Sequence, residues 1–208
     1  RTVQTFSVSS GGDVGVSQET TALPSGRDFL TALQQGGNLF VIGGYASNDG
    51  VGLSDVFSAS VEAGGAVSDW TPRTSLPSYR YGAAGVSWRD WLYVVGGATA
   101  EANAVASILF TRPAADATLG QWSVTLPLPA EVYGAAAVVH DDRLFVAGGE
   151  DGGVLLASVW SAPMDPVTGE VGPWVPLTAL PSARAGSTAV TRGRYLYVVG
   201  GAVDNRFE

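Results

Sequence analysis

The chain has 208 residues, of which 46% are hydrophobic, and its net charge is −8 with no lysine among its 11 basic residues. An acidic chain without a basic stripe argues against nucleic acid or an anionic membrane as a partner. The absence of cysteine excludes disulfides, thiol nucleophiles and cysteine-based zinc or iron–sulfur sites. No apolar run approaches the roughly 18 residues that a membrane span requires.

Two short strands are expected before the first repeat begins. Segments 3–8 and 14–21 are rich in valine and threonine, and Gly11-Gly12 lies between them. This pattern favours a β-hairpin. In their order and spacing the two segments match the third and fourth strands of the repeats that follow.

A repeat of about 52 residues then runs through the chain. Its clearest element is an apolar strand that ends in a glycine pair, and the copies start 53, 52 and 52 residues apart, at 39–44, 92–97, 144–149 and 196–201. Four apolar residues before two glycines predict a buried strand that stops at a sharp turn. A fixed period of this length indicates a repeat architecture.

Each repeat predicts four antiparallel strands. It opens with Leu-Pro at Leu23, Leu76, Leu128 and Leu180, and a strand of small residues and the glycine-pair strand follow. Small side chains indicate crowding by neighbouring backbone, so this first strand is expected nearest the axis of a radial array. After a variable loop come a third strand at 55–58, 107–110 and 158–161 and a tryptophan strand. Repeated tryptophans at one position predict core residues: Trp70, Trp122 and Trp174.

The order of glycine-pair strand, tryptophan and Leu-Pro-x-x-Arg-x-Gly resembles the Kelch repeat over essentially the whole chain. The resemblance implies an all-β, Kelch-like β-propeller with one four-stranded antiparallel blade per repeat. The blades are expected at about 23–75, 76–127, 128–179, and 180–208 plus 1–22. Joining the two ends gives 51 residues between the last and the first Leu-Pro. We therefore expect the N- and C-terminal ends to share the closing blade of a single domain, which would hide the last edge strand.

Three assemblies agree with four blades' worth of sequence. One is a monomer that closes a four-bladed ring, and another is a homodimer that completes a larger, eight-bladed ring. The third is a fragment of a larger Kelch protein, since members of the family usually have six or seven blades.

A ligand site is predicted at the central mouth. Arg27, Arg80 and Arg184 occupy one repeat position just after Leu-Pro, and the remaining repeat has Glu131 beside it. A partial ring of arginines suits a carboxylate or an acidic peptide. Aromatic side chains near the same mouth would suit a sugar or a protein side chain: Tyr79, Tyr81 and Tyr133, with Tyr45. The alternative is that the arginines bond loop carbonyls or carboxylates and the tyrosines pack between blades.

Other chemistry is not predicted. His140 is the only histidine, and no repeat supplies a serine in a nucleophile elbow beside it. Segments 48–50 and 151–153 lack the alternating oxygen ligands of a calcium loop, so no metal and no cofactor is expected. Trp88 and Trp91 are not repeated and are candidates for an exposed contact.

These observations predict a non-enzymatic binding module that presents propeller loops to a protein or glycan partner. The first alternative is a structural scaffold, an engineered propeller or a fragment of a larger Kelch protein. The second is a sugar-processing enzyme of the Kelch-propeller type, with Arg27, Arg80, Arg184 and Glu131 as its site. The copper radical oxidases of this fold need a cysteine-linked tyrosine, which a chain without cysteine excludes.

Overall fold

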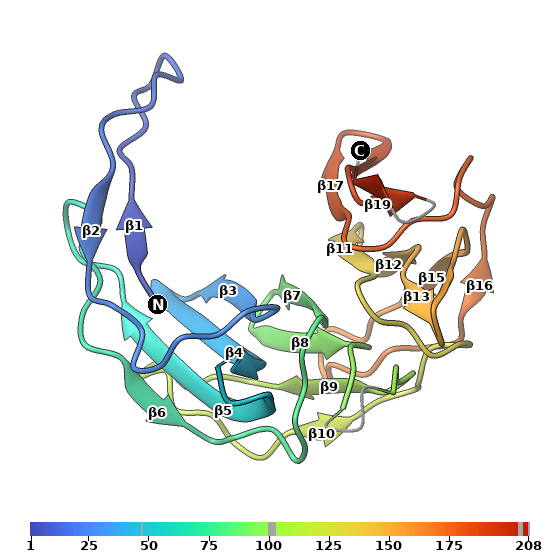
Figure 1. The fold of residues 1–208 in the computed structure, drawn as a ribbon, viewed down its shortest axis with the longest axis horizontal. Coiled ribbons are helices and arrows are strands. Elements are labelled where there is room, and N and C mark those ends of the chain that lie inside the picture. The colour runs from blue at the N-terminus through green and yellow to red at the C-terminus, as the bar shows by residue number, and fades with distance from the viewer. Residues whose placement is uncertain (47, 100–102, 204–205, 208) are drawn as a thin grey trace.

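The computed structural model describes residues 1–46, 48–99, 103–203 and 206–207. These segments form an all-β structure in which three four-stranded antiparallel sheets stand side by side along an arc (Figure 1). A two-stranded ribbon lies at each end of the arc. None of the described residues belongs to a helix that could cross a membrane.

The three complete sheets confirm the predicted order of strands within a blade. The first blade contains β3 (Thr31–Gln35), β4 (Asn38–Ala46), β5 (Val51–Ser60) and β6 (Thr71–Arg73). The second contains β7 (Ala84–Trp88), β8 (Trp91–Val95), β9 (Ile108–Thr111) and β10 (Ser123–Val124). The third contains β11 (Ala136–His140), β12 (Arg143–Ala147), β15 (Val159–Pro163) and β16 (Val175–Pro176). A small hairpin, β13 (Glu150–Asp151) and β14 (Val154–Leu155), lies in the loop of the third blade.

The glycine pairs allow one blade to approach the next. Gly43 has φ of 57°, in the left-handed region that glycine adopts without strain. A Cβ atom at Gly43 would lie 2.2 Å from the carbonyl oxygen of Arg80 in the second blade. The backbone N–H of Gly44 donates to that same carbonyl oxygen at 2.9 Å. A side chain at Gly43 would therefore push the two blades apart.

A belt of hydrogen bonds joins the innermost residues of successive blades. The N–H of Gly82 donates to the carbonyl oxygen of Phe29, and the N–H of Gly134 donates to that of Gly82, both at 2.9 Å. The N–H of Gly186 continues the belt to the carbonyl oxygen of Gly134 at 2.7 Å. These residues occupy one repeat position, so the belt holds the small-residue strands around a common axis, as the sequence predicts.

The core lies between blades, and the glycine-pair strand of the second blade has a blade on both sides. In β8, Leu92 and Val94 pack toward the first blade, and Tyr93 and Val95 pack toward the third. All four are at most 1% exposed. A strand buried on both faces reads as a continuous apolar run rather than an alternating one. Of the predicted core tryptophans, Trp122 is buried and Trp174 half-buried at these interfaces. Trp70 is half-buried against the N-terminal segment, where its Nε1 donates to the carbonyl oxygen of Thr21 at 3.0 Å.

The structure differs from the predicted closing blade. The N-terminal ribbon is β1 (Val3–Thr5) with β2 (Gln18–Thr20), and the C-terminal ribbon is β17 (Thr188–Arg192) with β18 (Tyr195–Val199). The C-terminal ribbon is followed by the pair β19 (Ala202–Val203) and β20 (Arg206–Phe207). The two ribbons are separate sheets that lie at opposite ends of the arc (Figure 1).

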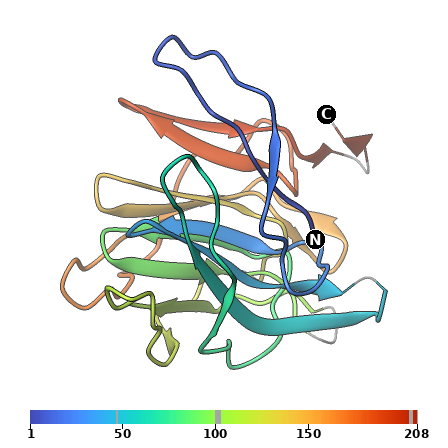
Figure 2. The same cartoon turned by 90° about the vertical axis from the view of Figure 1, so that its left-hand side faces the viewer.

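The ribbons are nevertheless the expected halves of a blade. Thr5 pairs with Gln18 in the register in which Ser58 pairs with Thr71 in the first blade. The hairpin between β1 and β2 extends beyond the blades (Figures 1 and 2). The angle between blades is set by the side chains packed between them, and in this structure it does not bring the two ribbons together. The ring sizes expected for a monomer or a homodimer therefore stay predictions.

Candidate functional site

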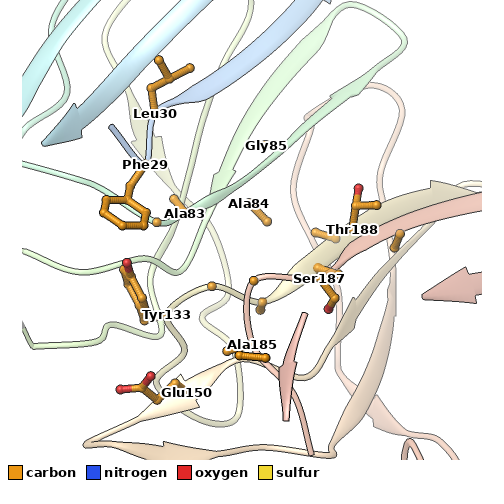
Figure 3. Close-up of a pocket in the computed structure, with 18 residues that line it drawn as sticks. Phe29, Leu30, Ala83, Ala84, Gly85, Tyr133, Glu150, Ala185, Ser187 and Thr188 are labelled. Atoms are coloured by element: carbon orange, nitrogen blue, oxygen red, sulfur yellow. The ribbon is translucent and has the colours of Figure 1, made fainter. Parts of the chain in front are cut away.

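An axial cavity of about 460 Å³ opens between the inner strands (Figure 3). Its walls are mostly alanine and glycine from the second, third and last repeats. The larger side chains at its rim are Phe29, Tyr133 and Glu150, which lie along one side in Figure 3. The small-residue strands thus leave an apolar hollow, and the loops decide what borders it.

Four equivalent backbone bridges surround the mouth of this cavity. They pair Asp28 with Tyr45, Tyr81 with Ala98, Tyr133 with Glu150, and Ala185 with Ala202. Directly opposed residues of an antiparallel pair carry their side chains on the same face. The backbone repeats at these positions while the side chains differ from blade to blade. Folding therefore does not require the aromatic and acidic residues that gather here.

Four aromatic side chains form a row across the mouth, which we call the aromatic row: Phe29, Tyr45, Tyr81 and Tyr133. The ring centroids lie 5.2 Å apart for Tyr45 and Tyr81, 5.8 Å for Tyr81 and Tyr133, and 6.3 Å for Phe29 and Tyr133. These distances are typical of tilted and edge-to-face aromatic contacts. The structure thus brings together three of the four predicted tyrosines, Tyr45, Tyr81 and Tyr133. Tyr79 is 41% exposed and packs beside Gly52.

Glycine makes room for the central ring of the aromatic row. Gly82 lies beneath Tyr133, and a Cβ atom at Gly82 would come within 2.0 Å of Cε2 of that ring. The backbone of the second blade therefore supports the ring of the third. This contact fixes Tyr133 on the rigid inner belt.

A second, smaller cavity of about 350 Å³ lies beside the aromatic row. Tyr81, Tyr133 and Glu150 line it, together with Ala98, Ala104 and the glycines at 152 and 153. Burial raises the pKa of Tyr133, and the charges of Tyr81 and Glu150 raise it further. Burial also raises the pKa of Tyr81, with Tyr45 adding to the effect. Both phenols are therefore neutral at pH 7, and Glu150 carries the formal charge of this cavity.

The predicted arginines are bonded within their own blades. The Arg27 side chain is fully buried and pairs with Asp55 at 2.8 Å, while Arg80 is 4% exposed. Each Nη1 group donates to the first glycine of its own glycine pair, from Arg27 to Gly43, from Arg80 to Gly96 and from Arg184 to Gly200. These bonds are the alternative foreseen from the sequence, in which arginine holds loop carbonyls. A ligand role for Arg27, Arg80 and Arg184 stays a prediction.

Other predicted residues lie apart from the aromatic row. Glu131 is exposed. Trp88 is not the exposed contact that its sequence position suggests, because it is 7% exposed and its Nε1 donates to Oδ1 of Asp142 at 3.0 Å. His140 lies at the turn that joins β11 to β12, with Nε2 3.4 Å from Oδ2 of Asp141. Within the described segments, no three histidine, cysteine or acidic side chains gather as ligands for a metal.

Phe29 was missed by the sequence reasoning. It occupies the belt position that is Gly82, Gly134 and Gly186 in the other repeats, yet it has φ of 51° and is 59% exposed. A bulky residue in the left-handed region is an outlier, and such strain gathers at functional sites. The available signal was the motif itself, since the first repeat reads Leu-Pro-Ser-Gly-Arg-Asp-Phe where the motif has Leu-Pro-x-x-Arg-x-Gly.

Phe29→Gly is expected to raise the free energy of unfolding by about 0.5–1 kcal/mol. Glycine removes the left-handed strain, and the gain exceeds the entropy that glycine adds to the unfolded chain. Urea unfolding followed by tryptophan fluorescence measures it, with Phe29→Ala as the control that removes the ring and keeps the strain. A loss of stability in both variants would show that the ring supports the fold.

Comparison with known proteins agrees with this architecture. The solved structure described as "Structure of YjhT" has a TM-score of 0.72 at 15% identity, over 98% of this chain and 74% of that chain, which shows the fold alone. Beta-scruin of Limulus polyphemus is 24% identical over 184 residues, which are 85% of this chain and 19% of that protein. Kelch repeat-containing protein At3g27220 of Arabidopsis thaliana is 37% identical over 84 residues, or 40% of this chain and 20% of that protein.

The chain thus spans about a fifth of the length of these two curated relatives. The family model of the KLHDC2/KLHL20/DRC7 Kelch-repeats domain matches residues 29–208, which include the three complete blades and the C-terminal ribbon. With the glycine pairs, the belt and the four-stranded sheets in place, the chain belongs to the Kelch-repeat family.

Proposed function

We propose that this chain is a non-enzymatic interaction module whose aromatic row binds a segment of a protein partner. Kelch repeats are generally protein-interaction modules. The observation that carries the proposal is the aromatic row, an unrepeated set of rings at the mouth of an axial cavity. Tyrosine and phenylalanine are enriched in protein interfaces, where they supply large contact areas at low entropic cost.

The arrangement suits an extended segment that crosses three blades. Phe29 and Tyr45 belong to the first repeat, Tyr81 to the second and Tyr133 to the third, and the belt holds their backbones. A partner side chain could enter the axial cavity, whose walls of alanine and glycine favour an apolar group. A preorganised row spares the partner the cost of ordering the site.

The chemistry of the mouth supports binding over turnover. The side chains that converge there are three phenols, one phenyl ring and the carboxylate of Glu150. Apart from its two phenols and Glu150, the described lining of the smaller cavity is alanine and glycine, and so it holds no serine, threonine, cysteine, lysine or histidine to act as nucleophile or base. The single histidine lies at a β-turn, away from both cavities.

Peptide selection tests this proposal without a known partner. Random 12-residue peptides displayed on phage are selected against the protein, and the affinities of the selected peptides are measured by fluorescence polarisation. We expect Tyr81→Ala to weaken them at least about tenfold, as for an interface hot spot. Tyr195→Ala is the matched control, because Tyr195 is 68% exposed and lies on β18, outside both cavities.

Two outcomes would contradict the proposal. One is a set of peptides that bind Tyr81→Ala as tightly as the unaltered protein. The other is the absence of any selected peptide together with saturable binding on a glycan array, which would assign the mouth to a sugar. Near-ultraviolet circular dichroism shows that each variant is folded before its affinity is compared.

A further inference from the structure

The carboxylate of Glu150 lies beside the aromatic row, and its charge determines which partner side chain the row can bind. Tyr133 and Glu150 are directly opposed across a backbone bridge, with each N–H donating to the other's carbonyl oxygen at 2.9 and 2.8 Å. Their side chains thus leave the same face and border the same 350 Å³ cavity. Tyr81 lines the same cavity, with its ring edge-to-face against Tyr133.

No cationic side chain that the structure describes neutralises this carboxylate. Among the described residues Glu150 takes part in none of the ion pairs, which involve Asp55, Asp90, Asp141 and Asp142. Three arginines directly precede residues of the mouth bridges, and all are bonded within their own repeats to glycine carbonyls and serine hydroxyls, with Asp55 as a further partner of the first: Arg27, Arg80 and Arg184. The cavity therefore combines an unpaired, half-buried carboxylate with the electron-rich faces of two tyrosines.

Resting on the proposed function, we propose that the cavity between Tyr81, Tyr133 and Glu150 binds a cationic side chain of the partner segment, a lysine or an arginine. Aromatic faces attract cations, and the attraction grows as the cation loses water. A carboxylate at the rim adds a charge-assisted hydrogen bond. The net charge of −8 would attract a basic segment at long range. This reverses the acidic ligand that the row of arginines suggests in the sequence.

Comparison with the other repeats shows that the tyrosine–glutamate pair is not needed for folding. The equivalent bridge in the last repeat pairs Ala185 with Ala202, and in the second repeat Tyr81 is opposite Ala98. The bridge therefore forms without an acid in the second repeat and without either an acid or a ring in the last repeat. The tyrosine–glutamate pair of the third repeat is an addition to the Kelch framework, and a cation is the group that it fits.

Small probes test the inference directly. The rings of tyrosine are labelled with ¹³C, and the protein is titrated with Nα-acetyl-lysine amide, Nα-acetyl-norleucine amide and Nα-acetyl-glutamate amide while NMR spectra are recorded. We expect the lysine probe to shift the signals of Tyr81 and Tyr133 saturably, with at least tenfold higher affinity than the norleucine probe. Glu150→Gln is expected to lower the affinity for the lysine probe about five- to tenfold. We expect 0.5 M salt to lower this affinity as well.

Glu170→Gln is the matched control, because it removes the same charge from an exposed residue near the turn that Asp165 and Gly169 form, away from the cavity. Tyr81→Leu is a second variant, which keeps the cavity apolar and removes the aromatic face. Equal affinity of the lysine and norleucine probes would overturn the inference, as would an affinity that is the same in Glu150→Gln and in the unaltered protein.

The selected peptides distinguish this failure from failure of the proposed function. Peptides that need Tyr81 but tolerate glutamine in place of every lysine and arginine would contradict the cationic site and leave the interaction module standing. Peptides that ignore Tyr81 would contradict both. Peptides that lose at least tenfold in affinity on a single lysine or arginine replacement, and only while Glu150 is present, would support both.

Discussion

Tyr93→Ala is expected to lower the free energy of unfolding by about 4 kcal/mol, the largest single effect that we foresee. Tyr93 is 0% exposed and packs in the core between the second and third blades. Its ring stacks on Phe110 with centroids 5.9 Å apart, and its hydroxyl donates to the carbonyl oxygen of Gly169 at 2.8 Å. Truncating a buried aromatic residue to alanine typically costs 3–5 kcal/mol, because a cavity remains.

Urea unfolding measures this loss, and Tyr197→Ala is its control. Tyr197 occupies the same repeat position in the C-terminal ribbon but is 46% exposed, because no blade follows it. We expect that change to cost less than about 1 kcal/mol, since little apolar area returns to water. Similar losses for the two variants would mean that the face of the C-terminal ribbon is covered in solution.

The Tyr93 hydroxyl also predicts a dependence of stability on alkaline pH. Burial, with a smaller effect of Asp165, raises the pKa of Tyr93 far above its ordinary value of 10.0. The unfolded chain releases this proton near pH 10 and the folded chain retains it, so the stabilisation is complete below pH 10 and falls by about 1.4 kcal/mol per pH unit above it. Tyr93→Phe should cost about 1 kcal/mol at pH 7. Its stability relative to the unaltered protein should improve above pH 10.

Arg80→Ala is expected to cost about 3 kcal/mol, the second largest effect. The Arg80 Nη1 group donates to the carbonyl oxygen of Gly96 and to the Ser107 hydroxyl, both at 3.0 Å. Burial lowers the pKa of this guanidinium from its ordinary value, yet it stays protonated at pH 7. Alanine would leave the glycine carbonyl without its partner and open space at the end of the strand.

Arg112→Ala provides the matched comparison for Arg80. Arg112 pairs with Asp90 at 2.6 Å, but both side chains are more than half exposed. Exposed ion pairs contribute little, so we expect a change below about 1 kcal/mol. Thermal and urea unfolding of both variants measure the two losses of stability. If Arg80→Ala were as stable as Arg112→Ala, the bond to Gly96 would not hold the blade, and Arg80 would be available to a ligand.

The sequence alone determined the blades, because their information is local and periodic. The run Leu92-Tyr93-Val94-Val95 followed by a glycine pair specifies a strand with a sharp end, and its continuous apolar character predicts that both faces are covered by neighbouring blades. The match of the two N-terminal segments to the third and fourth strands of a repeat was also predicted from their order and spacing, and the structure pairs them accordingly.

Only the tertiary structure decided which residues meet at the mouth and how far the arc bends. Tyr81 and Glu150 are distant in sequence, and their common cavity depends on how two blades pack. The separation of the two ribbons depends in the same way on side-chain volumes between sheets, which composition and spacing do not encode. The role of Arg80 was open in the sequence for a related reason: a guanidinium can face a ligand or a glycine carbonyl, and the choice depends on whether the folded backbone places that carbonyl within 3.0 Å.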